Sequence, residues 1–346
     1  MRRLRVGLVG FGWFGRIHAQ AWARVPSVEL VAICDRDAAA LENGGGALPQ
    51  DAFHRDAGHA VADGPRASRY QSLEAMLAAE RLDLVDVVAP EAEHVALARS
   101  ALAAGVDVIV EKPFASVAAE ARALVAEARA LGRRLYAGHI LRFDRRHRAL
   151  KEDLDSRGAA LRHLSLQRHF QSSALAVYGR SHPFLAALVH DIDIALWLTG
   201  RRVARVQATT HGWRSPATVD VAVGQLRWDD GLVATLQNSW HLAAGCPYGF
   251  EFDTRVFADG ATYTLRNEPV LQVWDGAGAA APELFFWPLV GGQRDGALVD
   301  ELTHFAGCAA AGIESSRVPL DDVVHGLEVA EALVRASHSQ QWEPVT

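Results

Sequence analysis

Three glycines at fixed intervals near the start of the sequence constrain its fold more than any other feature. Gly10, Gly12 and Gly15 follow the apolar run Leu4–Val9 and open a helical pattern that continues to Arg24. In a strand–turn–helix unit, the first glycine permits a tight turn, the second leaves room for a pyrophosphate, and the third lets the helix pack on the strand. The pattern therefore predicts a dinucleotide-binding unit rather than a glycine-rich turn that binds nothing.

A second apolar run, Val28–Cys34, ends on Asp35, which stands 20 residues after Gly15. A carboxylate at this place accepts hydrogen bonds from an adenosine ribose, which predicts NAD as the cofactor. Arg36 follows directly and could instead bind a 2′-phosphate or stack on adenine, so NADP stays an alternative. We also expect Trp13 and Phe14, inside the glycine motif, to contact the cofactor.

The composition is that of a globular protein: half of the 346 residues are apolar and 22% are charged. A net charge of −6 argues against nucleic acid or an anionic membrane as the main partner. No apolar run reaches the ~20 residues needed to span a bilayer. The three cysteines, Cys34, Cys246 and Cys308, are far apart and show no metal-binding spacing. We therefore expect a cytoplasmic protein with reduced thiols, no targeting segment and no metal.

Two halves of the sequence show different patterns. The first third alternates short apolar runs with helical patterns, which predicts a parallel sheet covered on both faces. After about residue 145, strand-like segments dominate, with turn signals near 227–232 and 258–261 and closing helices near 296–310 and 321–338. We expect an α/β protein with a Rossmann domain at 1–122 and an α+β domain at 123–346. That second domain should hold an open, mostly antiparallel sheet, and the last helices could pack back on the first domain.

The chain carries a further series of short blocks in fixed order, which are His18, Ala32–Asp35, Ala89-Pro90 with His94, Ala104–Pro113, Gly138–Phe143, His190–Asp193, Trp197–Gly200 and Glu301–Phe305. Together with the glycine motif, these blocks resemble the Gfo/Idh/MocA family of NAD(P)-dependent oxidoreductases, which act on sugars, cyclitols and related compounds. The resemblance covers nearly the whole chain. It implies that Pro90, His94 and Glu111 lie at the cofactor and that the peptide bond before Pro113 is cis.

Lys112 and His190 are the candidate catalytic residues. Lys112 follows an apolar run at the expected C-terminal end of a parallel strand, where open α/β sheets bind ligands. Its ammonium could hold a substrate hydroxyl, and the resemblance gives it a part in proton transfer and cofactor contact; it could also only cap the strand or pair with Glu111. His190 could take the hydroxyl proton as general base, because imidazole titrates near neutral pH. Otherwise it is a helix-start histidine that serves packing.

One position departs from the family pattern. Family members carry an aspartate four residues before this histidine, and here that residue is Ala186. Other groups could complete the site or bind substrate, and each could equally be structural; these candidates are Arg142, Tyr178, Arg180, His182 and Asp191.

The sequence as a whole predicts an NAD-dependent oxidoreductase that acts on a secondary alcohol or ketone of a sugar, sugar derivative or cyclitol. Ala186 favours an alternative, a non-catalytic dinucleotide-binding sensor of the same fold. A third reading is an imine or dipyrrole reductase. Apolar residues such as Val223 and Leu226 fall on both faces of the expected sheet. An open apolar face usually packs on something, and the resemblance implies a homodimer or homotetramer built through this sheet.

Overall fold

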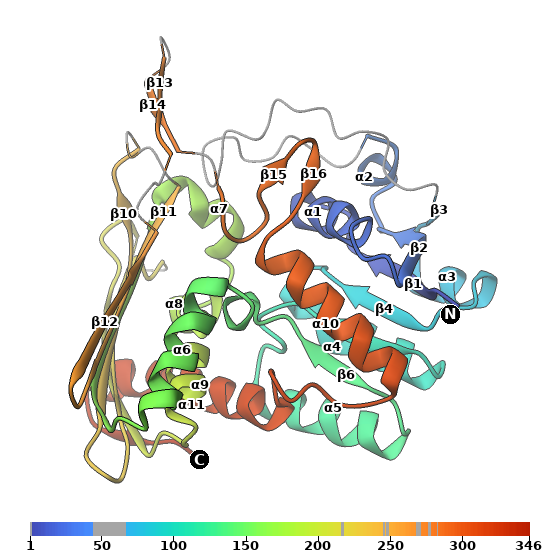
Figure 1. Ribbon diagram of the computed structural model, residues 1–346. Helices are drawn as coiled ribbons and strands as arrows, with labels where there is room; N and C mark the ends of the chain where they lie inside the picture. The colour runs from blue at the N-terminus through green and yellow to red at the C-terminus, as the bar shows by residue number, and fades with distance from the viewer. Residues whose placement is uncertain are drawn as a thin grey trace. The chain divides into compact units, whose positions relative to one another are not determined.

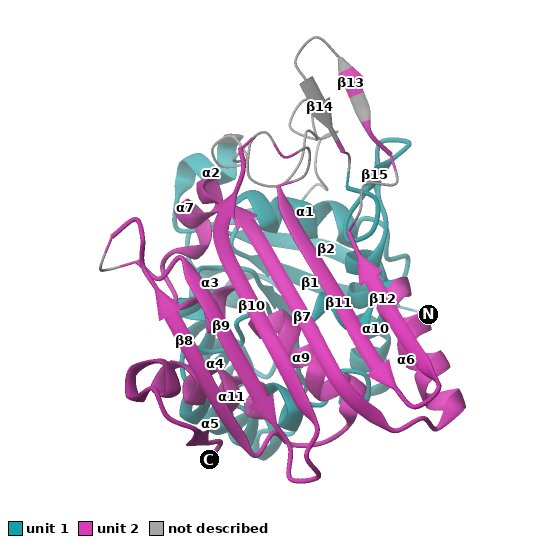
Figure 2. Cartoon of the chain, turned by 90° about the vertical axis from the view of Figure 1, so that its left-hand side faces the viewer, with its two compact units in different colours: residues 1–48, 56–144, 283–323 teal, residues 49–55, 145–282, 324–346 magenta. Residues whose placement is uncertain are grey.

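The structure is a computed structural model that describes residues 2–43, 67–215, 218–244, 246, 249–267, 271–275, 278–281 and 283–346. The chain divides into two compact units (Figure 2). The first comprises residues 1–48, 56–144 and 283–323, and the second comprises residues 49–55, 145–282 and 324–346. Each unit is described below by itself.

A six-stranded parallel sheet forms the centre of the first unit (Figure 1). Its order is β3-β2-β1-β4-β5-β6, and the strands are β1 (Leu4–Val9), β2 (Val28–Cys34), β3 (Ser68–Tyr70), β4 (Leu84–Val87), β5 (Asp107–Val110) and β6 (Leu135–Ala137). The order reverses between β1 and β4, and ligands of open α/β sheets bind at such a reversal. The predicted Rossmann domain is confirmed.

Helices cover both faces of this sheet, because right-handed crossovers that run in opposite directions from β1 place their helices on opposite sides. The helices are α1 (Trp13–Trp22), α2 (Ala38–Asn43), α3 (Leu73–Ala79), α4 (His94–Ala103), α5 (Ala118–Ala130) and α10 (Ala297–Ala311). Five of the strands are consequently mostly apolar and buried, as parallel strands between two helical layers must be, whereas the edge strand β3 is polar and largely exposed.

The first unit extends beyond the boundary expected after residue 122. That position falls inside α5, and β6 beyond it pairs in parallel with β5, so the first stretch of this unit ends at Asp144. Residues 283–323 then add α10, which packs on α1, and the short hairpin of β15 (Leu289–Val290) and β16 (Gln293–Arg294). A helix near the end of the chain thus belongs to the first unit.

The second unit is built on a seven-stranded mixed sheet of order β12-β11-β7-β10-β9-β8-β17. The strands are β7 (Leu161–Gln171), β8 (Arg205–His211), β9 (Val221–Arg227), β10 (Val233–Leu242), β11 (Phe250–Ala258), β12 (Ala261–Arg266) and β17 (Glu343–Pro344). Only β7 and β10 pair in parallel in this sheet. Both predicted hairpins, β9–β10 and β11–β12, are present.

Helices of the second unit cover one face of this sheet, and Figure 2 looks onto the other. The helices are α6 (Arg145–Arg157), α7 (Leu175–Tyr178), α8 (Pro183–Ala186), α9 (Val189–Thr199) and, from residue 324 on, α11 (Leu320–Ser339). Burial alternates along the strands, as a half-covered sheet requires. In β9, Ala222 and Leu226 are buried, whereas Val223 and Gln225 are exposed. Apolar residues therefore lie on both faces, as expected.

Candidate active site

The loop between β1 and α1 has the geometry that its glycines predict. Gly10 has φ +94°, and a Cβ there would lie 2.6 Å from the carbonyl oxygen of Val88. A Cβ on Gly15 would lie 2.0 Å from the Gly10 carbonyl oxygen, so only glycine lets α1 approach the strand. Gly12 faces open space and begins α1 without a side-chain cap. Free N–H groups at such a helix start attract phosphate, so this loop fits the pyrophosphate of a dinucleotide.

Asp35 lies directly beyond β2 and beside this loop. Its carboxylate accepts hydrogen bonds from the backbone N–H of Phe11 at 2.6 Å and of Asp37 at 2.9 Å. Carboxylate oxygens have spare acceptor capacity for ribose hydroxyls. Arg36 forms an ion pair with Glu93 at 2.8 Å, and both side chains are exposed enough for this pair to be weak. The roles of Asp35 and Arg36 in choosing the cofactor stay predictions.

Lys112 lies two residues after β5, at the C-terminal ends of the parallel strands. Its backbone N–H donates to Glu111 Oε2 at 2.9 Å, and the Lys112–Pro113 peptide is cis, as expected. The buried His94 joins this turn to the loop after β4: its Nδ1 lies 2.8 Å from the Pro113 carbonyl oxygen and its Nε2 lies 2.7 Å from that of Ala89. His94 thus holds two loops together, while its contact with a cofactor, like that of Pro90, stays a prediction.

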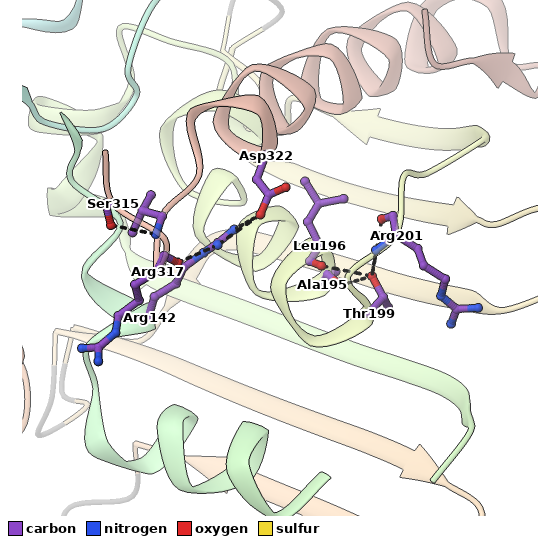
Figure 3. Close-up of polar contacts among 9 residues, drawn as sticks. Arg142, Ala195, Leu196, Thr199, Arg201, Ser315, Arg317 and Asp322 are labelled. Atoms are coloured by element: carbon purple, nitrogen blue, oxygen red, sulfur yellow. Dashed lines mark hydrogen bonds and ion pairs between the residues drawn. The ribbon is translucent and has the colours of Figure 1, made fainter. Parts of the chain in front are cut away.

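Arg142 is fully buried in the first unit. Its Nη1 donates to the Arg317 carbonyl oxygen at 2.9 Å, and both terminal nitrogens lie 3.2 Å from Asp322 Oδ2 (Figure 3). These contacts tie the segment after β6 to the start of α11. They agree with the structural alternative for Arg142, and its contact with substrate stays untested.

In the second unit, His190 occupies the first turn of α9, where the sequence predicts it. Its neighbour Asp191 is buried and forms a two-pronged ion pair with Arg168 of β7, at 2.8 and 3.3 Å. At the other end of α9, the Thr199 hydroxyl donates to the carbonyls of Ala195 and Leu196 (Figure 3). The carboxylate of Asp191 therefore joins α9 to the sheet, and it helps to position the neighbouring His190.

The segment before α9 contains the departure from the family pattern. Ala186 is the last residue of α8 and is buried. His182 caps that helix, because its Nδ1 accepts a hydrogen bond from Phe184 N–H at 3.3 Å. Burial lowers the pKa of His182 to about 4, so its ring is neutral at physiological pH. The ring of Tyr178 stacks near Phe170 and Trp240. Substrate contacts by these residues and by Arg180 stay predictions.

Comparison with known proteins places both units in one family. The model of the oxidoreductase family with an NAD-binding Rossmann fold, GFO_IDH_MocA, matches residues 4–139, and the model of the GFO/IDH/MocA C-terminal domain matches residues 168–264. D-apiose dehydrogenase of Paraburkholderia graminis is 31% identical over 280 residues, which are 77% of this chain and 68% of that protein. This chain belongs to the Gfo/Idh/MocA oxidoreductase family.

Other family members are similar over more of their length. Inositol 2-dehydrogenase of Leifsonia xyli subsp. xyli is 30% identical over 79% of this chain and 76% of that protein. The solved structure of myo-inositol 2-dehydrogenase from Lactobacillus plantarum has a TM-score of 0.80 at 22% identity and covers all of both chains. That of scyllo-inositol dehydrogenase from Lactobacillus casei with bound NAD(H) and scyllo-inositol has a TM-score of 0.78 at 19% identity, over 99% of each chain. At these identities, the two structures show a shared fold.

Two features of this Gfo/Idh/MocA chain escape a motif-based reading of the sequence. Trp287 packs edge-on against Phe14 and Trp13, with ring centroids 5.3 and 6.3 Å apart, so residues 283–296 reach the glycine loop. Arg69 of β3 stacks over Phe11 with its guanidinium 4.8 Å from the ring centroid. Both contacts join residues that are far apart in the sequence, and no local pattern marks them.

Two kinds of feature are absent from the part of the chain that the structure describes. Its helices include none with the length and apolar character to cross a bilayer. Its His, Cys, Asp and Glu side chains form no group of three or more that could hold a metal ion.

Proposed function

We propose that this Gfo/Idh/MocA protein transfers a hydride between NAD and a secondary alcohol or ketone of a sugar, sugar derivative or cyclitol. The observation that carries the proposal is the position of Lys112, which follows β5 at the C-terminal ends of the parallel strands, in the same unit as a glycine loop that fits a dinucleotide. The related apiose and inositol dehydrogenases support a polyhydroxylated substrate.

The proposed mechanism divides the work between two side chains. Bound nicotinamide supplies the hydride acceptor. The Lys112 ammonium donates a hydrogen bond to the carbinol oxygen and stabilises negative charge that develops there. His190 accepts the hydroxyl proton as general base. The Gly10–Gly15 loop holds the pyrophosphate, and Asp35 holds the adenosine ribose.

The experiment is NADH formation, followed by absorbance, with a panel of inositols, pentoses and hexoses. Lys112→Ala and His190→Ala should each lower turnover roughly 10²–10⁴-fold, because the first removes the charge that stabilises the carbinol oxygen and the second removes the general base. The affinity for NAD should be nearly unchanged in His190→Ala. If both residues act on one substrate, the fold decrease in turnover of the double variant should be far smaller than the product of the two single decreases. Independent, multiplicative losses contradict a shared site.

A sensor without turnover is the second candidate, and Ala186 is the observation that favours it, because the family's carboxylate is missing there. This alternative predicts NAD binding without NADH formation for any polyol, and no effect of His190→Ala.

Calorimetry with both nucleotides tests the choice of cofactor: Asp35 should make NAD bind at least about tenfold, or 1.4 kcal/mol, more tightly than NADP. Equal affinities would contradict the role given to Asp35.

The open face of the second unit's sheet supports a proposed homodimer or homotetramer. Val223 and Phe257 are 39% and 37% exposed on that face, and a second copy would bury them.

A cytoplasmic location is also proposed, because Cys34, Cys246 and Cys308 all form no disulfide.

A further inference from the structure

Four titratable side chains from separate elements of the first unit converge behind Lys112. They are His18 of α1, Asp86 of β4, Glu111 after β5 and Glu301 of α10, and none is more than 6% exposed. The mechanism proposed above uses none of them. Buried charges are costly unless they are paired, so this buried carboxyl–imidazole cluster requires a specific arrangement of protons.

The charge of His18 follows from its two partners. Its Nδ1 lies 2.9 Å from Asp86 Oδ2, and its Nε2 lies 3.5 Å from Glu111 Oε1. Burial alone would lower the pKa of His18, but the charges and hydrogen bonds of the two carboxylates raise it to about 10. At neutral pH, His18 is therefore an imidazolium between two carboxylates.

Glu111 and Glu301 flank the same turn after β6. Glu301 accepts the backbone N–H of His139, and a Cβ on the preceding Gly138 would lie 2.6 Å from Glu111 Oε1. Glu301 Oε1 is buried and has no hydrogen-bond partner among the residues that the structure describes. A buried ionised oxygen without a donor costs several kcal/mol, so the geometry favours a neutral Glu301 whose own O–H is the donor.

The electrostatics of the pair agree with this geometry. Two neighbouring buried carboxyls do not both ionise easily. Burial and the charge of Glu111 raise the pKa of Glu301 well above its usual value. Burial would also raise the pKa of Glu111, but the hydrogen bond and charge of His18 and the charge of Lys112 lower it. The proton of the pair therefore belongs on Glu301.

We propose that Glu301 is protonated at neutral pH, donates a hydrogen bond to Glu111, and is thereby a positioning residue for Lys112. The inference rests on the catalytic role proposed for Lys112. Glu111 Oε2 accepts the backbone N–H of Lys112, so the orientation of this carboxylate fixes the backbone from which the ammonium extends. The charged groups that face Glu301 are His18, Asp86 and Glu111, and the backbone N–H of His139 donates to it. Loss of its proton would add a second negative charge next to Glu111, the carboxylate whose charge interacts with Lys112, and would thereby raise the pKa of the Lys112 ammonium.

Infrared spectroscopy tests the protonation without any turnover. A protonated carboxyl has a C=O band distinct from those of carboxylates and amides. The parent at pH 7 should show such a band, and Glu301→Gln should lack it. Asp300→Asn is the matched control, because Asp300 is a carboxyl on the same helix whose loss should leave the band in place. Superimposable spectra for the parent and Glu301→Gln would overturn the proposal.

The pH profile of NADH formation tests the positioning. Glu301→Gln keeps a neutral N–H donor, so kcat/KM should stay within about threefold of the parent, with the same pH profile. Glu301→Met has no hydrogen-bond donor, so kcat should fall at least about tenfold while the KM for NAD stays unchanged. The pH midpoint of kcat/KM should also move by about half a unit or more. A Glu301→Met enzyme with the parent's profile would refute the positioning role. If the parent oxidises no polyol, the proposed function fails, and the infrared result still decides whether Glu301 holds the proton.

Discussion

His18 is held between Asp86 and Glu111, and its protonation is therefore coupled to folding. Its pKa is about 10 in the folded protein and near 6.5 when exposed. Between these values the folded state binds one more proton than the unfolded state. Stability from this group is thus fully present below about pH 6.5 and is lost as the pH rises through 10.

His18→Gln should remove this pH dependence. The free energy of unfolding of the parent should decrease by up to about 1.4 kcal/mol for each pH unit between 7 and 10 because of this one group. Urea unfolding at several pH values measures it, and the variant should show a flatter slope. Parallel slopes in both proteins would mean that His18 is not charged in the folded state.

Ala186 is the residue at which this chain leaves its family pattern, and Ala186→Asp restores the carboxylate. The site is buried, so we expect a loss of about 1–3 kcal/mol of stability, measured by urea unfolding. A carboxylate near His190 should favour the imidazolium and move the rising limb of the oxidation rate to higher pH. Ala186→Asn is the uncharged control. An equal pH profile in both variants would show that no coupling to His190 exists.

Individual residues differ in how far the sequence reveals them. The turn and close-packing roles of Gly10 and Gly15 follow from local spacing, and the structure confirms both. The ion pair of Arg168 with Asp191, and the approach of Glu301 to the Gly138–His139 turn, join segments that are distant in the chain. No local pattern encodes such pairings, and these contacts decide which charges are buried.

Among the elements, α9 is joined to the sheet by a buried ion pair. Asp191 in its first turn pairs with Arg168 of β7, and Asn238 of β10 donates to the Arg168 carbonyl oxygen at 2.8 Å. This ion pair helps to fix the position of α9 along β7. His190, one residue before Asp191, takes its place from it.

Asp191→Asn should therefore be costly, because it leaves the Arg168 charge buried without its partner. We expect a loss of about 3–5 kcal/mol in the free energy of unfolding, whereas replacing both residues together with Leu and Met should cost less. The control is Asp259→Asn, which breaks an exposed pair with Arg162 and should leave the unfolding midpoint unchanged. Similar effects of the two single variants would contradict a buried, desolvated pair.

At the scale of the molecule, the pattern of elements predicts the fold class well and the folding units less well. Alternating apolar runs and helices suffice for the parallel sheet, and the two turn signals suffice for the hairpins of the mixed sheet. The unit bounds depend on which sheet β6 joins and on where α10 packs. Both depend on tertiary packing against one of several similar apolar faces, and hydrophobic periodicity does not show which face is used.

Val223→Arg tests the proposed assembly through the open sheet face. Val223 is partly exposed on a strand in the interior of the sheet, so a charge there should oppose burial against a second copy. Light scattering at micromolar concentration should show an oligomer for the parent and a smaller mass for the variant. Gln225→Arg, on the same face, shows whether the effect spreads beyond Val223. A monomeric parent would refute the assembly.

The first unit is assembled from residues 1–48 and 56–144 and from a distant third stretch, residues 283–323, which follows most of the second unit in the chain. During synthesis, the ribosome must add 167 residues after Asp144 before α10 is complete, which takes ~8–33 s at typical rates of about 5–20 residues per second. Until then, α1 lacks the helix α10 that packs on it in the folded unit, and the cluster of His18, Asp86 and Glu111 lacks its fourth member, Glu301. The first unit therefore cannot be completed before translation has supplied α10.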